Sequence, residues 1–452
     1  MSIDLTELVA ALEGPLLTPA DPGFAAELSG SNLSYVHTPE LVVGAASVGD
    51  VQLAVRFAAE HGMHVTVRAT GHGDHATITH GMVITMKRLD AVEIDPTDRI
   101  ATIGGGARWA SVVAAAGVHG LAPVAGSSTN VGATGYLLGG GLGPLARSHG
   151  FSSDYVRELT VVTADGEVVR ASREEHPDLF WSLRGGKGGF GVVVQSRVQL
   201  IELATLYGGS LVFAEDDIET VLRGWIDWTH TAPDSVTTSI AIMHFPPIEQ
   251  VPEPMRGRTL LMLRFAFPGD AAEGVKLAAP LRALAAPFMD ALNELPASAI
   301  ATIHNDPTES GPGWASGLLL RDLDQDFANA VLATVGYGVD TPFLATEIRH
   351  IGGATRHDVE DGSAVGGRSA GYVMNVVGMP NPALFDTVLP GAFSAFLDAI
   401  APWISTDMNV NFRVWHTIEE FRTLWPAQTF TRLDVVRSEV DPSGVFPYGP
   451  AR

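Results

Sequence analysis

The hydrophobic positions fall into short runs separated by polar turns, and their spacing predicts the first elements of the fold. Residues 1–40 read as a short helix followed by a proline-interrupted loop. From Leu41 the run LVVGAAS predicts a strand, residues 50–61 a helix, and HVTVR a second strand. Ser47 and Asp50 supply N-cap chemistry for that helix. The chain therefore begins with strand, helix and strand in alternation.

Two glycine-rich stretches interrupt this pattern. They are VRATGHGDH at 67–75 and AGSSTNVGATGYLLGGGLG at 125–143, and each follows a strand-like run. Glycine has no Cβ and tolerates positive φ, so its backbone can approach a ligand closely. Successive N–H groups in such turns form a concavity suited to a diphosphate. We expect both stretches to hold one phosphate-bearing cofactor.

The rest of the first half reads as short strands around two helices. Strands are expected at 82–86, 91–95 and 99–106, a helix at 107–120, a hairpin at 156–172 with its turn at Asp165–Gly166, and a helix, glycine loop and long strand over 177–201.

After Ile201 the glycine loops become rarer and the strands and helices longer. Strands are expected at 208–214, 236–245, 259–267, 343–351 and 371–378, and helices near 215–231, 270–289, 324–334, 382–400 and 431–446, the last ending before Pro442. Strands that carry helices on one side indicate an α+β fold with a mainly antiparallel sheet.

Composition narrows the functional classes. The 452 residues carry a formal net charge of −23, so nucleic acid is an improbable partner. A bound diphosphate must then be held by local N–H groups. No cysteine is present, which excludes disulfides, thiolate catalysis, thiolate metal sites and cysteinyl cofactor links.

Targeting signals are weak. The start MSIDLTELVAALEG is acidic, and no run of 18 apolar residues occurs. We expect a cytoplasmic protein without a membrane span.

Parts of the sequence also match two other kinds of nucleotide-binding site. Gly141, Gly143 and Ala146 fit G-x-G-x-x-A, and Asp165 follows about 20 residues on, as in a Rossmann site. However, Pro144 and the preceding run of glycines are unusual at the start of the helix that a Rossmann site requires. A P-loop fits less well, because GGKGG at 185–189 lacks the GK[ST] ending.

Five histidines gather around the first glycine stretch. They are His61, His64, His72, His75 and His80. They fall on different local elements without an ordered carboxylate set, so no metal site is expected. His72 differs because glycines flank it on both sides, which puts it beside the cofactor.

Several ordered motifs together carry a family resemblance. The chain resembles FAD-linked oxidases with a vanillyl-alcohol-oxidase or PCMH type of FAD-binding domain, in the berberine-bridge-enzyme-like branch. The motifs are VRATGHG, GSSTNVGATGYLLGGGLG, DLFWSLRGGKGGFGVV, IGGA, GGRSAGY with Arg368, and RLDVVRSEVDPSGVF. The resemblance covers most of residues 40–200 and the last 20, and the middle only in patches.

The resemblance implies a domain plan and a set of site residues. An FAD-binding domain over 1–203 (core about 37–203) would be followed by a substrate domain over 204–405 and a C-terminal return over 406–452. His72 sits where the family forms an 8α-N-histidyl bond to FAD. The residues implied to contact the cofactor are Arg68, Ala69, Thr70, Gly71, His72, Gly73, Gly126, Ser127, Ser128, Val131, Gly132, Gly135, Leu142, Gly143, Asp154, Gly191 and Val193.

Three departures from the family pattern matter. Ser128 stands where some members carry a second, cysteinyl link, so any link here is single. The family's Y-x-N-Y motif reads Asn409-Val410-Asn411-Phe412, and phenylalanine cannot act as the base. The usual asparagine-bearing tail is replaced by PYGPAR.

The missing base leaves four candidates for proton removal. In TEIRHI, period-2 alternation puts Glu347 and Arg349 on one face and His350 on the other. Tyr372, which shares a face with Met374, and Tyr136 in the second glycine stretch are phenols that could serve. Each has a plainer interpretation: Glu347 with Arg349 as a surface pair, and Tyr372 as core.

Three functions remain open at this point. The first is an oxidase that uses FAD and O₂ on a C–O or C–N bond of a small molecule, giving H₂O₂. The second is a flavin-dependent dehydrogenase or cyclase that does not use O₂, and the third a non-catalytic flavin-binding protein. A monomer or homodimer is expected, and the sequence does not disclose the substrate.

Overall fold

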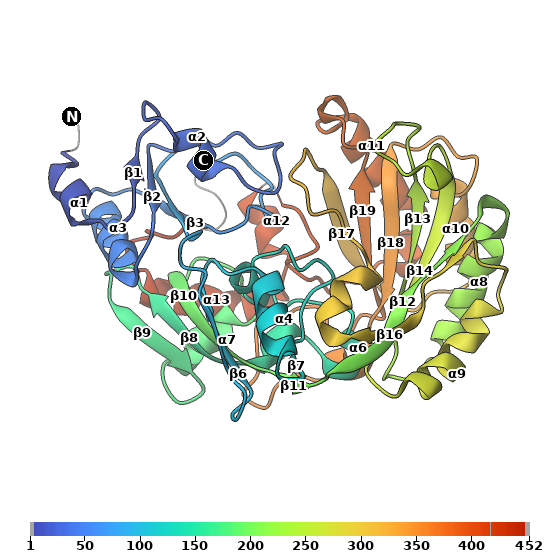
Figure 1. Cartoon of the computed structure of the whole chain (residues 1–452). Coiled ribbons are helices and arrows are strands. Elements are labelled where there is room, and N and C mark those ends of the chain that lie inside the picture. Colours follow the sequence, from blue (N-terminus) through green and yellow to red (C-terminus); the bar gives the residue numbers. More distant parts are fainter. Residues whose placement is uncertain (1–3, 416, 448–452) are drawn as a thin grey trace.

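The computed structural model describes residues 4–415 and 417–447, and it shows two groups of sheets side by side (Figure 1). In the first half, one sheet has the order β1-β2-β4-β3 and a second the order β5-β6-β10-β8-β9. The strands of these sheets are β1 (Leu16–Leu17), β2 (Leu41–Gly44), β3 (Val65–Arg68), β4 (Met82–Thr85), β5 (Val92–Asp95), β6 (Ile100–Gly104), β8 (Val156–Val162), β9 (Val168–Ser172) and β10 (Val192–Gln199).

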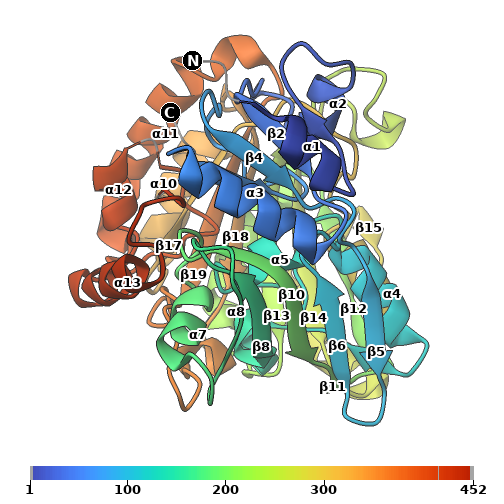
Figure 2. The same ribbon diagram turned by 90° about the vertical axis from the view of Figure 1, so that its left-hand side faces the viewer.

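In the first sheet, β2, β4 and β3 run parallel, and helix α3 (Val48–Glu60) connects β2 to β3. The Ser47 hydroxyl accepts the N–H of Asp50, which confirms the predicted N-cap. Side chains of this sheet and helix share a core with Val162 and Val192 of the second sheet. Figure 2 shows α3 lying across the outer side of this half.

The second sheet is antiparallel throughout, and several short helices complete this half. These are α4 (Trp109–Gly117), α5 (Ala133–Leu137), α6 (Ala146–His149) and α7 (Pro177–Leu183), with α1 (Thr6–Ala11) and α2 (Phe24–Leu28) before them and the strand pair β7 (Leu121–Ala122) and β11 (Ile201–Glu202) at the end. Helix α6 spans a single turn after Gly143, and Asp165 lies in the β8–β9 turn, so the Rossmann alternative is excluded.

The second half is built on one eight-stranded antiparallel sheet with the order β15-β12-β14-β13-β18-β19-β17, with β16 also paired to β12. The strands are β12 (Thr205–Phe213), β13 (Thr237–His244), β14 (Thr259–Phe267), β15 (Met289–Asp290), β16 (Asn293–Pro296), β17 (Ala315–Leu320), β18 (Phe343–His350) and β19 (Tyr372–Gly378). Helices α8 (Ile218–Thr229), α9 (Ala271–Arg282), α10 (Gln325–Val335) and α11 (Val388–Ala399) pack on one face of it (Figure 1).

The chain then returns to the first half. Helices α12 (Ile418–Arg422) and α13 (Ala427–Val440) place Phe421 and Leu433 in a core with α4 and α7, and Val445 and Phe446 join the core of the first sheet. We therefore propose that the domain boundaries lie near residues 203 and 405, as the sequence suggested. Residues 448–452 of the unusual tail lie outside the described part.

Most predicted elements are confirmed, two helices have clearly different bounds, and one long strand of the large sheet was not predicted. The helix expected over 270–289 ends at Arg282, because Met289 and Asp290 pair with β12 instead. The helix expected from residue 382 begins at Val388, after a separate 3₁₀ turn at Pro382–Leu384. Strand β17 was not predicted at all. None of the helices in the described residues is long and apolar enough to cross a membrane.

Candidate active site

The first glycine stretch leaves the end of β3 and is shaped by Arg68. This side chain is buried, pairs with Asp74 and donates to the carbonyl of Leu28. Gly71 has φ +72°, and a Cβ there would press on the Arg68 guanidinium. Because that guanidinium is committed inside the loop, a diphosphate at this stretch would meet backbone groups rather than the Arg68 side chain.

His72 lies at the tip of this loop and is half-buried. Its Nδ1 is 2.9 Å from the Ser31 hydroxyl and 2.9 Å from the Thr70 hydroxyl. Burial, reinforced by the charge of Arg108, lowers the pKa of His72 to about 4, with Asp74 acting in the opposite direction. The imidazole is therefore neutral at pH 7, which leaves it a nucleophile.

The second glycine stretch folds into a turn followed by the short helix α5. The N–H of Gly132 reaches the Thr70 hydroxyl at 3.3 Å, so the two stretches lie side by side as the sequence suggested. Arg108 fixes the turn by donating to the carbonyl and side-chain oxygens of Asn130, at 2.5 and 2.6 Å. Ser127 is buried and Ser128 half-buried within this turn.

The glycines of the two stretches fall into two groups, those in close contact with neighbouring atoms and those that face open space. A Cβ on Gly143 would overlap the carbonyl oxygen of Ala125, and one on Gly126 would lie 3.0 Å from the ring of Tyr136, so these positions require close packing. Gly73 and Gly135 are exposed, and a Cβ on either would meet nothing within 4 Å. Bare backbone facing open space on both stretches fits a diphosphate-bearing cofactor such as FAD.

The other residues that the resemblance implied as cofactor contacts are spread over the pocket wall, an ion pair and the start of β10. Leu142 and Gly143 line a pocket between the two halves. The Asp154 carboxylate is 2.7 Å from Arg368; burial raises the pKa of Asp154, and Arg368 acts against that rise. This carboxylate is therefore engaged by a cation of the chain itself. Gly191, with φ +118°, precedes β10. Ala69 and Val131 are half-buried, and Val193 is buried.

The opposite wall of the pocket is the helix-free face of the large sheet. Ser239 on β13 is the register partner of Arg264 on β14 and of Arg349 on β18, so these three side chains form a row across the sheet. Glu347 lies two residues before Arg349 and therefore projects from the same face. The structure brings together the Glu347 and Arg349 that the sequence analysis placed on one face, and both are largely buried rather than on the surface.

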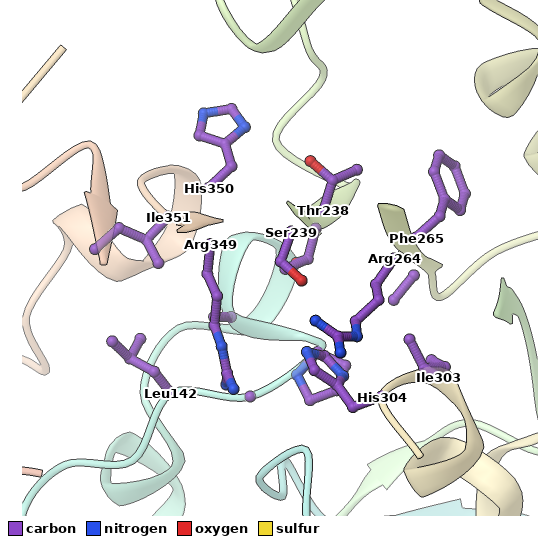
Figure 3. Close-up of a pocket in the computed structure, with 15 residues that line it drawn as sticks. Leu142, Thr238, Ser239, Arg264, Phe265, Ile303, His304, Arg349, His350 and Ile351 are labelled. Carbon is purple, nitrogen blue, oxygen red and sulfur yellow. The ribbon is translucent and has the colours of Figure 1, made fainter. Parts of the chain in front are cut away.

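The pocket holds about 360 Å³ of space outside atoms, open solvent at its mouth included. It is lined by Leu142, Gly143, Pro144 and Ala146 on one side and by Thr237, Thr238, Ser239, Arg264, Phe265, Ala266, Ile303, His304, Arg349, His350 and Ile351 on the other (Figure 3). It thus joins the second glycine stretch to the polar row of the sheet.

Glu347 is held by several donors. Its Oε1 accepts from Arg264 Nη1 at 2.9 Å and from the Ser239 hydroxyl at 3.0 Å, and its Oε2 accepts from Arg349 Nε at 2.8 Å. Burial alone would raise the pKa of Glu347, but the charges of Arg349 and Arg264 lower it well below its usual range. The carboxylate is ionised and is a weak proton acceptor.

His304 follows the 3₁₀ segment Ala297–Ile303 and is buried beside Glu347. Its Nε2 is 3.3 Å from Glu347 Oε1, and neither ring nitrogen has a hydrogen-bond partner in the described part of the chain. Burial lowers the pKa of His304, aided by Arg264 and Arg349 and opposed by Glu347. Sequence reasoning missed His304, Arg264 and Ser239, because they come from separate segments: sheet register brings Ser239 and Arg264 together, and the 3₁₀ segment before His304 packs against them.

Two of the other candidate bases face elsewhere. The Tyr372 hydroxyl is 2.6 Å from that of Thr229, within the core under the helices. His350 stacks on Tyr372 at 5.0 Å between ring centroids, and its Nε2 is 2.9 Å from Arg147 Nη1. Burial and the Arg147 charge lower the pKa of His350 to about 2. This placement does not support either residue as the base.

Tyr136 lies on α5, against the second glycine stretch. Burial raises the pKa of Tyr136 far above its usual value, with Ser152 and Arg349 acting in the opposite direction. The carbonyl of Tyr136 accepts from Asn411 Nδ2 at 2.9 Å. The neighbouring Phe412, which replaces the family tyrosine, has its ring 5.9 Å from the Arg349 guanidinium carbon. The substituted motif therefore reaches the pocket.

The loop histidines do not assemble into a metal site. No group of three His, Asp or Glu side chains that could hold a metal ion occurs in residues 4–415 and 417–447.

Comparisons with known proteins point in the same direction. A model described as an FAD binding domain matches residues 39–172. (R)-6-hydroxynicotine oxidase of Paenarthrobacter nicotinovorans is 33% identical over 237 residues, which are 51% of this chain and 52% of that protein. The chain thus spans about half the length of the curated relatives that it matches first.

Solved structures extend the likeness to the whole chain. 6-Hydroxy-D-nicotine oxidase from Arthrobacter nicotinovorans superposes with a TM-score of 0.82 at 25% identity, covering 96% of both chains. BBE-like 1 of Physcomitrella patens superposes with a TM-score of 0.83 at 17% identity, covering 100% of this chain and 99% of the other.

The fold is the two-domain α+β fold that the resemblance to vanillyl-alcohol-oxidase or PCMH-type flavoproteins implied, and the chain shares it with 6-hydroxy-D-nicotine oxidase. Residues 39–172 match an FAD binding domain, and about half of the chain is similar in sequence to 6-hydroxynicotine oxidase, which agrees with the resemblance that the sequence motifs predicted.

Proposed function

We propose that the protein is an FAD-dependent oxidase acting on a C–O or C–N bond of a small molecule, with O₂ reduced to H₂O₂. The observation that carries the proposal is the pocket where Leu142 and Gly143 of the cofactor stretch meet the polar row of the large sheet. A concave pocket with apolar walls and a few polar groups is the usual setting for a small-molecule substrate. The relation to a protein named as an oxidase supports the choice of acceptor.

We further propose that FAD is bound covalently through His72 alone. A neutral imidazole at the tip of the first stretch can form such a bond, since its pKa is lowered to about 4. The absence of cysteine from the sequence leaves no thiol for a second link, and Ser128 lies in the second stretch. Backbone groups of 68–73 and 126–135 would hold the diphosphate and the ring system.

Bound FAD would supply hydride acceptance and electron transfer to O₂. The chain must remove the proton from the substrate O–H or N–H, and the acceptor must lie within hydrogen-bond reach of it. We assign this task to His304, because it is buried at the pocket wall, neutral, and free of hydrogen-bond partners among the described residues. Glu347 is less suited, since three donors hold its charge.

The covalent link is tested by denaturing the purified protein and following the yellow colour. We expect colour to stay with the wild-type polypeptide and to be released from His72→Ala. The matched control is His80→Ala, an exposed histidine of the same region, which should behave as the wild type. Colour lost from the denatured wild type would contradict the covalent assignment.

The use of O₂ is tested by reducing the bound flavin under anaerobic conditions and mixing it with air in a stopped-flow instrument. Fast reoxidation with one H₂O₂ formed per flavin is expected. Slow reoxidation would favour a dehydrogenase. Flavin bleaching across alcohols, amines and sugars then identifies the substrate.

A further inference from the structure

One guanidinium in the pocket has an edge without an acidic partner. Arg264 donates from Nη1 to Glu347, its Nη2 has only the Met262 sulfur at 3.9 Å, and its Nε has no hydrogen-bond partner in the described residues. The residue is 7% exposed. A thioether is a weak acceptor, so two donors on one edge of a buried cation are left essentially unused. Such groups in a native structure require an explanation.

The geometry of this edge suits one kind of ligand. The Nε–H and the adjacent Nη2–H of a guanidinium point in parallel and match the two oxygens of a carboxylate. Glu347 occupies the other end of the group, so an incoming carboxylate would not displace it. Figure 3 shows the Arg264 guanidinium reaching down the pocket toward His304.

The acidic groups around the pocket leave the Nε and Nη2 edge of Arg264 free for an anion. Two arginines, Arg264 and Arg349, share the single buried carboxylate of Glu347. The half-buried Asp306 acts on Arg349, raising its pKa, and accepts from Ser127 at 3.1 Å. The charges of these four groups balance, so Arg264 is distinguished by the unused donors on its Nε and Nη2 edge. The chain as a whole is strongly acidic, so an anionic substrate requires a local cation of this kind.

We propose that this pocket binds the carboxylate of an organic acid substrate on the Nε and Nη2 edge of Arg264. The proposal rests on the proposed function, because it names the substrate class of that same site. The apolar walls, which include Leu142 and Ile303, would take the body of the acid. The hydroxyl or amine to be oxidised would face His304.

Calorimetric titration of the flavin-containing protein with benzoate and with benzamide tests the proposal. The two ligands have nearly the same shape and differ in charge, and the visible flavin spectrum reports whether binding occurs beside the cofactor. We expect benzoate to bind at least tenfold more tightly than benzamide and to perturb the flavin spectrum. Equal affinities, or no benzoate binding at millimolar concentration, would overturn the proposal.

Variants locate the binding group. Arg264→Gln should weaken benzoate binding at least tenfold and leave benzamide unchanged. Arg264→Lys keeps a charge for Glu347 and loses the two-donor edge, so it should give an intermediate loss even if the glutamine variant folds poorly. The control Lys276→Gln removes a charge from an exposed side chain of α9 and should bind as the wild type. Wild-type benzoate affinity in Arg264→Lys would count against the assigned edge.

The outcomes distinguish a failure of the carboxylate subsite from a failure of the proposed oxidase function. A protein that oxidises neutral substrates and ignores benzoate overturns the carboxylate subsite and keeps the proposed function. A protein that binds benzoate through Arg264 and whose flavin reoxidises slowly in air keeps the subsite and overturns the oxidase function.

Discussion

Three histidines of this protein, His72, His304 and His350, are neutral at pH 7 for one physical reason. Burial lowers the pKa of each, with His304 and His350 buried and His72 half-buried, and each has at least one arginine whose charge disfavours a second positive charge. The consequence differs with position. At His72 neutrality leaves a nucleophile, at His304 a proton acceptor, and at His350 a group that must charge when the protein unfolds in acid.

The buried His350 should make the protein less stable as the pH falls. Its pKa of about 2 in the folded state lies below the ordinary value near 6.5, so the unfolded chain takes the proton first. Stability is therefore lost as the pH drops below about 6.5, by about 2 kcal/mol at pH 5 from this residue. Thermal melting at pH 7 and pH 5 should show a smaller drop in Tm for His350→Asn than for the wild type.

The control for this prediction is His64→Asn, which removes an exposed histidine and should keep the wild-type drop. An unchanged pH dependence in His350→Asn would mean that His350 is protonated in the folded protein or that other groups dominate.

At the pocket, His304→Gln should lower kcat/KM by about 10²- to 10⁴-fold, the usual contribution of a positioned base. The flavin content should stay at the wild-type level, because His304 lies outside both glycine stretches. Raising the pH should partly restore the rate with substrates whose own proton is acidic. Full activity in His304→Gln would remove it from the mechanism.

Single residues were predictable where local sequence determines their surroundings. Strand periodicity predicted the common face of Glu347 and Arg349, which the structure confirms, while the place of His72 beside the cofactor, read from its flanking glycines, stays a prediction. Arg264 could not be identified as a pocket residue in this way. Its neighbours in the pocket are set by the register of β14 against β13 and of β13 against β18. A hydrophobic run such as TLLMLRFAF predicts a strand and says nothing about its neighbours.

At the scale of elements, substitutions in the two glycine stretches can test whether the cofactor lies against them. A methyl group at Gly73 or Gly135 meets nothing within 4 Å, and neither residue has positive φ. Gly73→Ala and Gly135→Ala should therefore fold normally and carry less flavin per protein, because the methyl group enters the space assigned to the cofactor. The ratio of flavin to protein absorbance measures the effect.

The control is Gly391→Ala on helix α11, where a methyl group is also unopposed and far from the stretches. It should keep the wild-type flavin ratio. Wild-type flavin content in both Gly73→Ala and Gly135→Ala would argue that the cofactor lies elsewhere.

Elements with a strong local pattern were predicted well. The hairpin of β8 and β9 turns at Asp165 and Gly166 as expected, and Gly166 has φ +74°. The failures have non-local causes. Helix α9 stops early because the following residues pair with β12, and β17 is a short apolar run whose identity as a strand comes from β19 beside it.

At the scale of the molecule, Arg147 fastens one half to the other. This buried side chain on α6 donates to the carbonyls of Val236 and Ile351 at 2.8 and 2.7 Å and to Asp234 at 3.0 Å. Arg147→Met leaves the buried carbonyls without their donor and should cost about 1–3 kcal/mol for each of them. Differential scanning calorimetry should show a lower Tm and a split into separate transitions for the two halves.

The matched control is Arg157→Met, which removes an exposed arginine with one hydrogen bond to the Asp154 carbonyl. It should melt as the wild type. A single unshifted transition in Arg147→Met would show that the halves are joined by other contacts, such as those of Asn130 with Thr308 and Ser31 with Gly311.

The return of the C-terminal segment to the first half sets an order of assembly during translation. Phe421 and Leu433 complete one core of that half, and Val445 and Phe446 another, so neither is finished until the ribosome reaches them. At about 5–20 residues per second, residues 203–420 take on the order of 10–40 s to synthesise. The large sheet, whose strands all lie between residues 205 and 378, can fold in that interval. We therefore expect the nascent chain to complete its second half first. The FAD-binding half is completed last, when the C-terminal segment joins its cores.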